Sequence, residues 1–282
     1  CQGSGRMNAF SWKPRALALN VVMLAAGALT LFPLVWMLSV SLMEPGESSS
    51  FPLPMLPKAA TLHSYRELFG QAGIGRYLLN SLLLSCAATV LSLLFNVSAG
   101  YAFAKLRFQG RDRIFKVMLG ALVIPSQVAM LPLFLLLKYL GLVNTYGAVL
   151  VPAMAGIFGI FLVRQYALTI PDALLEAARM DGAGEFRIFR VIVLPLLTPT
   201  LVTLGIFTFL GTWNDFMWPL IVLTDKDLYT LPVALASLSR EHVQDNELMM
   251  AGSVLTILPV LLLFLCLQRY YMQGLLVGSV KG

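Results

Sequence analysis

The sequence has little charge, cysteine or histidine. Of its 282 residues, 12% are Asp, Glu, Lys or Arg, whereas an average soluble domain has about a quarter. Three cysteines and two histidines are too few and too scattered for a disulfide framework or a metal cluster. Hydrophobic residues make up 58% of the chain, and the mean hydropathy is +0.80. Because so little charge cannot cover a soluble core of this size, the sequence predicts a protein that faces lipid.

Motifs for nucleotide binding and hydrolysis are also missing from the sequence. It contains no G-x-x-x-x-G-K-[ST] loop, no G-x-G-x-x-G after a strand, no H-E-x-x-H and no G-x-S-x-G. No connection between apolar runs exceeds about 35 residues, which is too short for a nucleotide-binding domain. We therefore predict no catalytic residue and no metal site in this chain, which argues against a membrane-embedded enzyme.

Six runs without Asp, Glu, Lys or Arg are long enough to cross a bilayer. A transmembrane helix needs about 20 largely apolar residues, and the runs have 21 to 28. Backbone polar groups in lipid must be satisfied internally, so each run is expected to be helical. The sequence predicts an all-α membrane protein with spans at about 17–40, 77–104, 117–137, 141–163, 191–214 and 248–268.

Basic residues in the connections predict the orientation. One side carries 14 of them, including Lys105, Arg107 and Arg179, and the other side carries six. The positive-inside rule then places both termini in the cytoplasm. Residues 1–15 are expected to be a cytoplasmic tail, with 1–6 resembling a tag remnant or mis-start, and 16–282 one membrane domain. The first run is longer than a signal-peptide core, which disfavours the alternative of a cleaved signal.

The connection before the fifth span predicts a short helix. Thr169-Ile-Pro-Asp172 has a hydroxyl cap, an early proline and an acidic residue, and Gly182 suits a left-handed helix end. From the residues alone, this helix either docks against a partner or lies on the lipid headgroups.

The same connection contains a family motif. Glu176-Ala177-Ala178, three residues, Gly182, nine residues and Ile192-Val193-Leu194-Pro195 match the pattern E-A-A-x3-G-x9-I-x-L-P. This sequence resembles the "EAA" loop of the permeases of ATP-binding-cassette importers. Further segments, such as Trp213-Asn214-Asp215-Phe216, are similar to the carbohydrate-uptake, maltose-G-like subfamily. The resemblance implies the type I importer permease fold with a cytoplasmic coupling helix.

The resemblance also implies partners and a location. These are a second permease subunit, a dimer of ATPase subunits that bind ATP and Mg, and an extracytoplasmic solute-binding protein, all at a bacterial inner membrane. This chain itself is expected to bind no cofactor. Residues implied in ATPase coupling are Glu176, Ala177, Ala178, Arg179, Asp181 and Gly182, with Arg179 and Asp181 assigned contact only. An ion-coupled secondary transporter is the alternative, disfavoured because no ionisable residue lies within the predicted spans.

Neutral hydrogen-bonding residues and tryptophan suggest a path for a sugar or polyol. We predict that this path contains Asn96, Ser126, Gln127, Thr208, Thr212, Trp213 and Asn214. The structural alternative is hydrogen bonding between helices for the polar residues and an interfacial aromatic belt for the tryptophan.

The long connection 215–247 has apolar patches that a solvated linker does not need. By resemblance, it reaches the docked binding protein. The residues predicted to make that contact are Tyr229, Leu231, Leu235 and Leu238.

Overall fold

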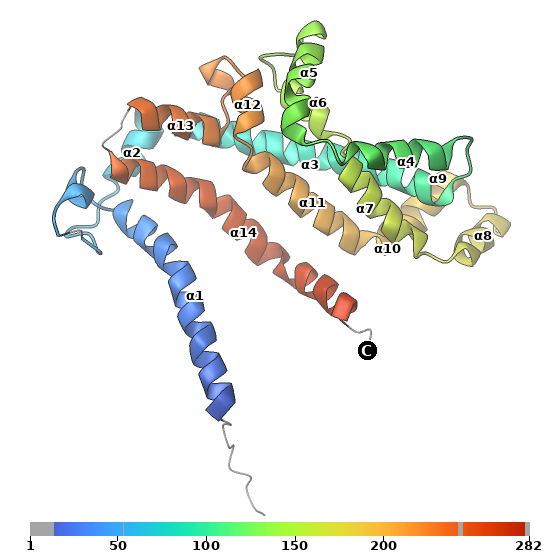
Figure 1. The fold of residues 1–282 in the computed structure, drawn as a ribbon, viewed down its shortest axis with the longest axis horizontal. Helices are drawn as coiled ribbons and strands as arrows, with labels where there is room; N and C mark the ends of the chain where they lie inside the picture. Colours follow the sequence, from blue (N-terminus) through green and yellow to red (C-terminus); the bar gives the residue numbers. More distant parts are fainter. Residues whose placement is uncertain (1–13, 53, 242–244, 280–282) are drawn as a thin grey trace, which may run out of the picture. The chain divides into compact units, whose positions relative to one another are not determined.

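The computed structural model describes residues 14–52, 54–241 and 245–279, and every regular element in these ranges is a helix (Figure 1). The predicted tail of residues 1–15 therefore lies almost wholly outside the described residues. The chain divides into two compact units, residues 1–67 with 243–254, and residues 68–242 with 255–282.

The first unit contains α1 (Pro14–Val40), the short η1 (Glu47–Ser49), most of α2 (His63–Gly70) and the first turns of α14 (Asn246–Ser279). The apolar window of α1 buries none of its residues within the chain, as expected for a helix that faces lipid or another protein. Beyond α1 the polypeptide is held by hydrogen bonds. The fully buried Glu247 accepts the backbone N–H of Ser48 at 2.8 Å, and Glu47 accepts that of Lys58 at 2.8 Å.

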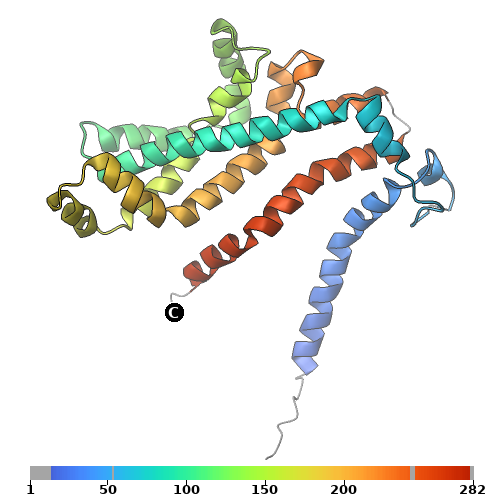
Figure 2. The ribbon, with the colours of Figure 1, turned by 180° about the vertical axis from the view of Figure 1, so that it is seen from behind.

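The second unit is organised around the long helix α3 (Ile74–Lys105). In both views α7 (Ile157–Leu168) and α11 (Thr198–Trp213) lie along α3 (Figures 1 and 2), and their contacts with it are the most extensive between helices in the described chain. The remaining elements of this unit are α4 (Arg111–Ala121), α5 (Ser126–Tyr139), α6 (Gly147–Ala153), α8 (Asp172–Met180), α9 (Glu185–Ile188), the π-helical η2 (Phe189–Val193), α10 (Leu194–Leu196), α12 (Met217–Val222), η3 (Lys226–Leu228) and α13 (Leu231–Glu241).

Among the described residues, four helical segments are individually long and apolar enough to span a bilayer, and there are six if two bent pairs each count as one span. The bent pairs occupy two of the predicted spans. Residues 111–139 bend by 108° ahead of α5, and residues 185–213 bend by 77° ahead of α11. Pro125 precedes α5, and Pro199 is in the first turn of α11, where its missing N–H and its ring oppose a continuous helix. The predicted spans at 117–137 and 191–214 thus each correspond to a bent pair of helices.

Close contact between α3 and α7 depends on glycine. A Cβ added at Gly100 would lie 2.6 Å from the Cβ of Val163, and one at Gly159 would lie 2.7 Å from the Nδ2 of Asn96. Small residues of this kind let helix backbones approach in membrane proteins, where lipid offers no hydrophobic driving force for association. Gly100 and Gly159 therefore set the distance between the two helices.

We predict that Gly100→Ala lowers the stability of the detergent-purified protein by about 1–3 kcal/mol, because the added methyl group overpacks the contact with Val163. The matched control is Gly120→Ala in α4, where an added Cβ meets nothing within 4 Å. The control should be neutral or slightly stabilising, because alanine favours a helix. Equal thermal melting of the two variants would contradict the assigned role of Gly100.

Candidate functional site: a helix attached to α3 and a polar cavity

Helix α8 is the short helix predicted from the sequence, and one side chain anchors it in the core. Leu175 is 1% exposed and packs in a cluster with Val97, Val163 and Ile188. Glu176, Ala177 and Arg179 are exposed, and Met180 is 90% exposed. The helix therefore leaves most of its surface, apolar groups included, available to another molecule.

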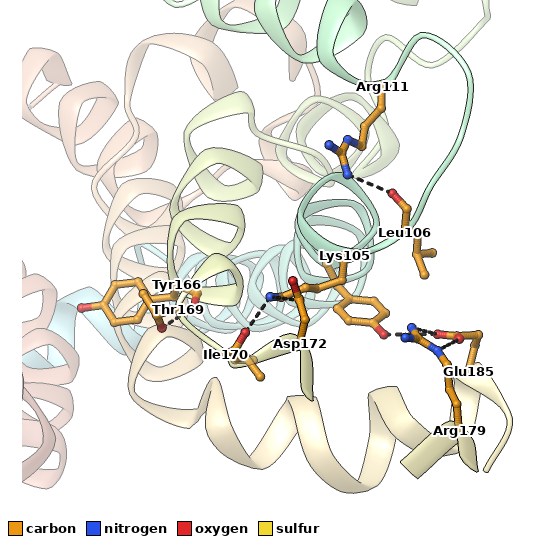
Figure 3. A network of polar contacts seen from close by, with 10 residues as sticks. Lys105, Leu106, Arg111, Tyr166, Thr169, Ile170, Asp172, Arg179 and Glu185 are labelled. Atoms are coloured by element: carbon orange, nitrogen blue, oxygen red, sulfur yellow. Dashed lines mark hydrogen bonds and ion pairs between the residues drawn. The ribbon is translucent and has the colours of Figure 1, made fainter. Parts of the chain in front are cut away.

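The end of α8 follows the prediction and its start does not. Gly182 adopts a left-handed φ of +80°, and Ala183 N–H donates to the Ala178 carbonyl at 3.0 Å, which closes the helix end. The predicted hydroxyl cap is absent, because Thr169 Oγ1 donates to the Tyr166 carbonyl at 2.7 Å and Pro171 precedes the helix (Figure 3).

Lys105, the last residue of α3, holds the start of α8. Its Nζ donates to Asp172 Oδ1 and to the Ile170 carbonyl, both at 2.6 Å (Figure 3), and its side chain is only 5% exposed. The hydrogen bond and positive charge of Lys105 keep the pKa of Asp172 below its usual value, so the carboxylate stays ionised at neutral pH. From the sequence, Lys105 is only a basic residue that indicates the orientation, and its contact with Asp172 depends on the fold.

A second contact joins the far end of α8 to the same helix. Arg179 Nε donates to Glu185 Oε1 at 2.6 Å (Figure 3), and Tyr101 Oη donates to Glu185 Oε2 at 3.4 Å. The hydrogen bond from Arg179 to Glu185 raises the pKa of the guanidinium. Tyr101 and Lys105 are four residues apart and share one face of α3. Together, the Lys105–Asp172 and Tyr101–Glu185–Arg179 contacts, here called the α3–α8 contacts, attach both ends of α8 to one long helix.

The predicted solute-path residues fall into two groups. Ser126, Gln127 and Thr212 line one cavity of about 430 Å³, with Met130, Val149 and Trp218 among its apolar walls. A volume in this range is typical of small-molecule sites. Asp215, which follows α11, lines the same cavity. From the sequence alone it is either a gating or solute residue or an interfacial charge beside a helix end.

The other four residues of the predicted path have contacts that join or stabilise helices. Asn96 donates to Ser92 Oγ at 2.7 Å, and Ser92 and Thr208 lie 3.2 Å apart across α3 and α11. Trp213 is 1% exposed and donates to the Thr256 carbonyl at 3.0 Å. Asn214 is exposed, and its side-chain amide donates to the Leu210 carbonyl at 2.9 Å. These four do not line the cavity.

The residues predicted to contact a binding protein are buried or half-buried within this chain. Leu231 is fully buried, and Ser81 on α3 accepts its backbone N–H at 2.7 Å. Leu235 and Leu238 follow at i+4 and i+7 on the same face of α13 and are half-buried, as is Tyr229. The apolar pattern in this segment is therefore that of a helix packed on its own chain, and Leu231 does not offer its side chain to a partner.

Comparison with known proteins identifies the family. Residues 96–276 match the family model described as binding-protein-dependent transport system inner membrane component. The chain is 44% identical to the arabinooligosaccharides transport system permease protein of Halalkalibacterium halodurans over 80% of this chain and 81% of that protein. It is 39% identical to the Bacillus subtilis protein of the same description, over 94% and 96%, and 34% identical to the lactose transport system permease protein of Rhizobium radiobacter, over 95% and 97%.

A solved structure has the same fold. It is a chain of a bacterial ABC transporter involved in the import of the acidic polysaccharide alginate, with a TM-score of 0.81 and 23% identity, covering 93% of this chain and 99% of that one. Because the identity is low, this likeness concerns the fold alone. From its sequence and fold, the chain belongs to the family of binding-protein-dependent transport system inner membrane components and is a multi-pass permease.

Proposed function

We propose that this permease couples ATP hydrolysis by partner subunits to the import of an oligosaccharide or related polyol. The observation that carries the proposal is the exposed surface of α8, whose two ends are attached to α3. The names of the relatives, which transport arabinooligosaccharides and lactose, support a sugar as the solute. An ion-coupled carrier is disfavoured by membership of this family.

In this proposal α8 is the coupling helix. Exposed Glu176 pairs with a basic residue of the ATPase, and the small side chains of Ala177 and Ala178 permit close docking. When the ATPase dimer closes, the force on α8 passes through the α3–α8 contacts to α3 and then to α7 and α11, which pack along it. The spans then change from one access state to the other.

In the proposed assembly this chain forms a heterodimer with a second permease subunit. Two ATPase subunits that bind ATP and Mg contact this heterodimer from the cytoplasm, and a solute-binding protein docks on it from outside. The apolar surface of α1, unburied in its own chain, supports contact with another membrane subunit or lipid. Lys105, Arg107 and Arg111 line one cavity together with Asp172 and Glu176, which supports a common side for these two connections. By the positive-inside rule we expect that side, and both termini, to be cytoplasmic. On the other side, the half-buried Tyr229, Leu235 and Leu238 are the groups that we propose contact the binding protein.

We expect Glu176→Lys and Gly182→Val to abolish uptake while the importer still assembles in the membrane. Glu176→Lys replaces attraction to a basic partner by repulsion. Gly182→Val places a β-branched residue at a φ of +80°, at a cost of about 1–3 kcal/mol. Uptake is measured in proteoliposomes with purified partner subunits.

The control for the charge reversal is Asp112→Lys, an equal change at a carboxylate that is also exposed, on α4. It should leave uptake close to the unsubstituted level. Normal uptake by Glu176→Lys and Gly182→Val would show that α8 is not the coupling element.

A separate prediction concerns Lys105. Lys105→Met keeps the length of the side chain but removes its bonds to Asp172 and the Ile170 carbonyl. Because α8 is then released from α3 at its start, we expect transport per ATP hydrolysed to fall at least about tenfold, since the loss of even one hydrogen bond to a charged group has an effect of this size.

The readouts are ATP hydrolysis and sugar uptake in the same proteoliposomes. Lys116→Met, at an exposed lysine of α4, is the matched control and should keep the ratio of uptake to hydrolysis unchanged. An unchanged ratio in Lys105→Met would mean that the contact does not transmit motion.

A further inference from the structure

The cavity between α5, α6, α11 and α12 has one charged group in its lining. Its polar side chains are Ser126, Gln127, Thr212 and Asp215, and the other lining residues are apolar or glycine. The charge is therefore a single carboxylate among hydroxyl and amide groups, and no basic residue of the described chain lines the cavity to neutralise it.

Asp215 is held in a fixed position by the turn between α11 and α12. Its Oδ1 accepts the backbone N–H of Trp218 at 3.3 Å. Burial raises the pKa of the Asp215 carboxyl group, and the backbone N–H groups of Trp218 and Met217 oppose that rise because they stabilise the ionised form. Trp218 is itself fixed, because its indole donates to the Ala148 carbonyl on α6 at 3.0 Å. An ionised carboxylate has about four acceptor positions. Two backbone donors leave acceptor capacity for a molecule in the cavity.

A carboxylate in this setting discriminates between solutes. It accepts hydrogen bonds from the hydroxyl groups of an uncharged sugar, and such bonds are stronger than those between neutral groups. It repels a solute carboxylate, and the apolar walls increase that repulsion because they lower the local dielectric constant. The Ser126, Gln127 and Thr212 side chains supply neutral groups that also pair with hydroxyls.

We propose that Asp215 is a specificity-determining residue that selects uncharged, polyhydroxylated solutes and excludes carboxylated sugars such as uronates. The inference rests on the proposed transport function for the identity of the solute. It assigns the cavity of this subunit to solute contact and adds a charge criterion that the family membership does not supply.

The competing explanation is that Asp215 only stabilises the start of α12. Asp215→Asn separates the two, because the amide oxygen can still accept the Trp218 N–H while the negative charge is lost. Asp225→Asn is the matched control. Asp225 also accepts a backbone N–H at the start of a short helix, from Asp227 at 3.0 Å, but it does not line the cavity.

The first experiment measures charge in the cavity without relying on transport. A Ser126→Cys variant of the assembled importer, with its native cysteines replaced by alanine, is treated with cationic and anionic methanethiosulfonate reagents of similar size. We expect the cation to react faster, and Asp215→Asn to reduce the ratio of cation to anion rates by at least about fivefold. Asp225→Asn should leave this ratio unchanged. An equal ratio with and without Asp215→Asn would overturn the proposal.

The second experiment tests which solutes are transported. A screen of neutral and uronate oligosaccharides first identifies the sugar that the cognate binding protein binds. Uptake of that sugar is then measured in proteoliposomes that contain the importer and the binding protein. We expect the binding protein to select a neutral sugar. Asp215→Asn should reduce uptake of that sugar about ten- to hundredfold, the effect of losing a hydrogen bond to a charged group. The stimulation of ATP hydrolysis by the loaded binding protein should be nearly unchanged in this variant.

A uronate as the transported sugar would overturn the proposal. So would uptake that Asp215→Asn leaves intact, or uptake that falls only in proportion to ATP hydrolysis. Failure of the proposed function is distinguishable, because it would appear as absent transport in the unsubstituted importer and in Asp225→Asn alike. The thiol reaction rates would still test the carboxylate in that case.

Discussion

The second unit depends on the close approach of α3 to its neighbours. Gly100 leaves no room for a side chain beside Val163, and Gly159 leaves none beside Asn96, so α3 and α7 meet nearly backbone to backbone. Since lipid is as apolar as the helix surfaces, this contact must come from van der Waals packing and hydrogen bonds. With α11 along the same helix, α3 becomes the element to which the connections of this unit attach.

Polar side chains at both ends of α3 make those attachments. At one end Asn80 donates to the carbonyls of Asp227 and Tyr229 at 2.9 and 3.0 Å, and Ser81 accepts the Leu231 N–H. At the other end Lys105 and Tyr101 hold the two ends of α8 through Asp172 and Glu185. Buried or half-buried polar groups are favourable only when paired, and here their partners belong to segments far away in the sequence. The single helix α3 thus connects the proposed coupling helix α8 at one end to residues 227–231 at the other end.

The polar groups of the cavity differ from these attachments because they face open space. Ser92 and Thr208 form a hydrogen bond between α3 and α11, and Asn96 bonds to Ser92 on its own helix and lies against Gly159 of α7. Ser126, Gln127, Thr212 and Asp215 instead surround about 430 Å³ of space. The bend before α5 adjoins this cavity at Ser126, and the break between α11 and α12 adjoins it at Asp215. Irregular backbone at membrane depth is tolerated where it lines protein or a cavity.

The helical membrane class, the position of α8 and its left-handed end at Gly182 could be predicted from the sequence, because they follow from run length, apolar content and local backbone preference. The length of an apolar run gives no information about bends. Two of the predicted spans are bent pairs of helices, and only the structure shows that the chain changes direction near their prolines. Polarity alone also did not separate the cavity residues Ser126 and Gln127 from the interface residues Asn96 and Thr208. Lys105, Glu185 and Asp215 were visible as charges, but their roles depend on partners brought together from different helices. Only the tertiary structure decides which polar groups meet one another and which face open space, because the free energy of a polar group depends on its partners and not on its residue type.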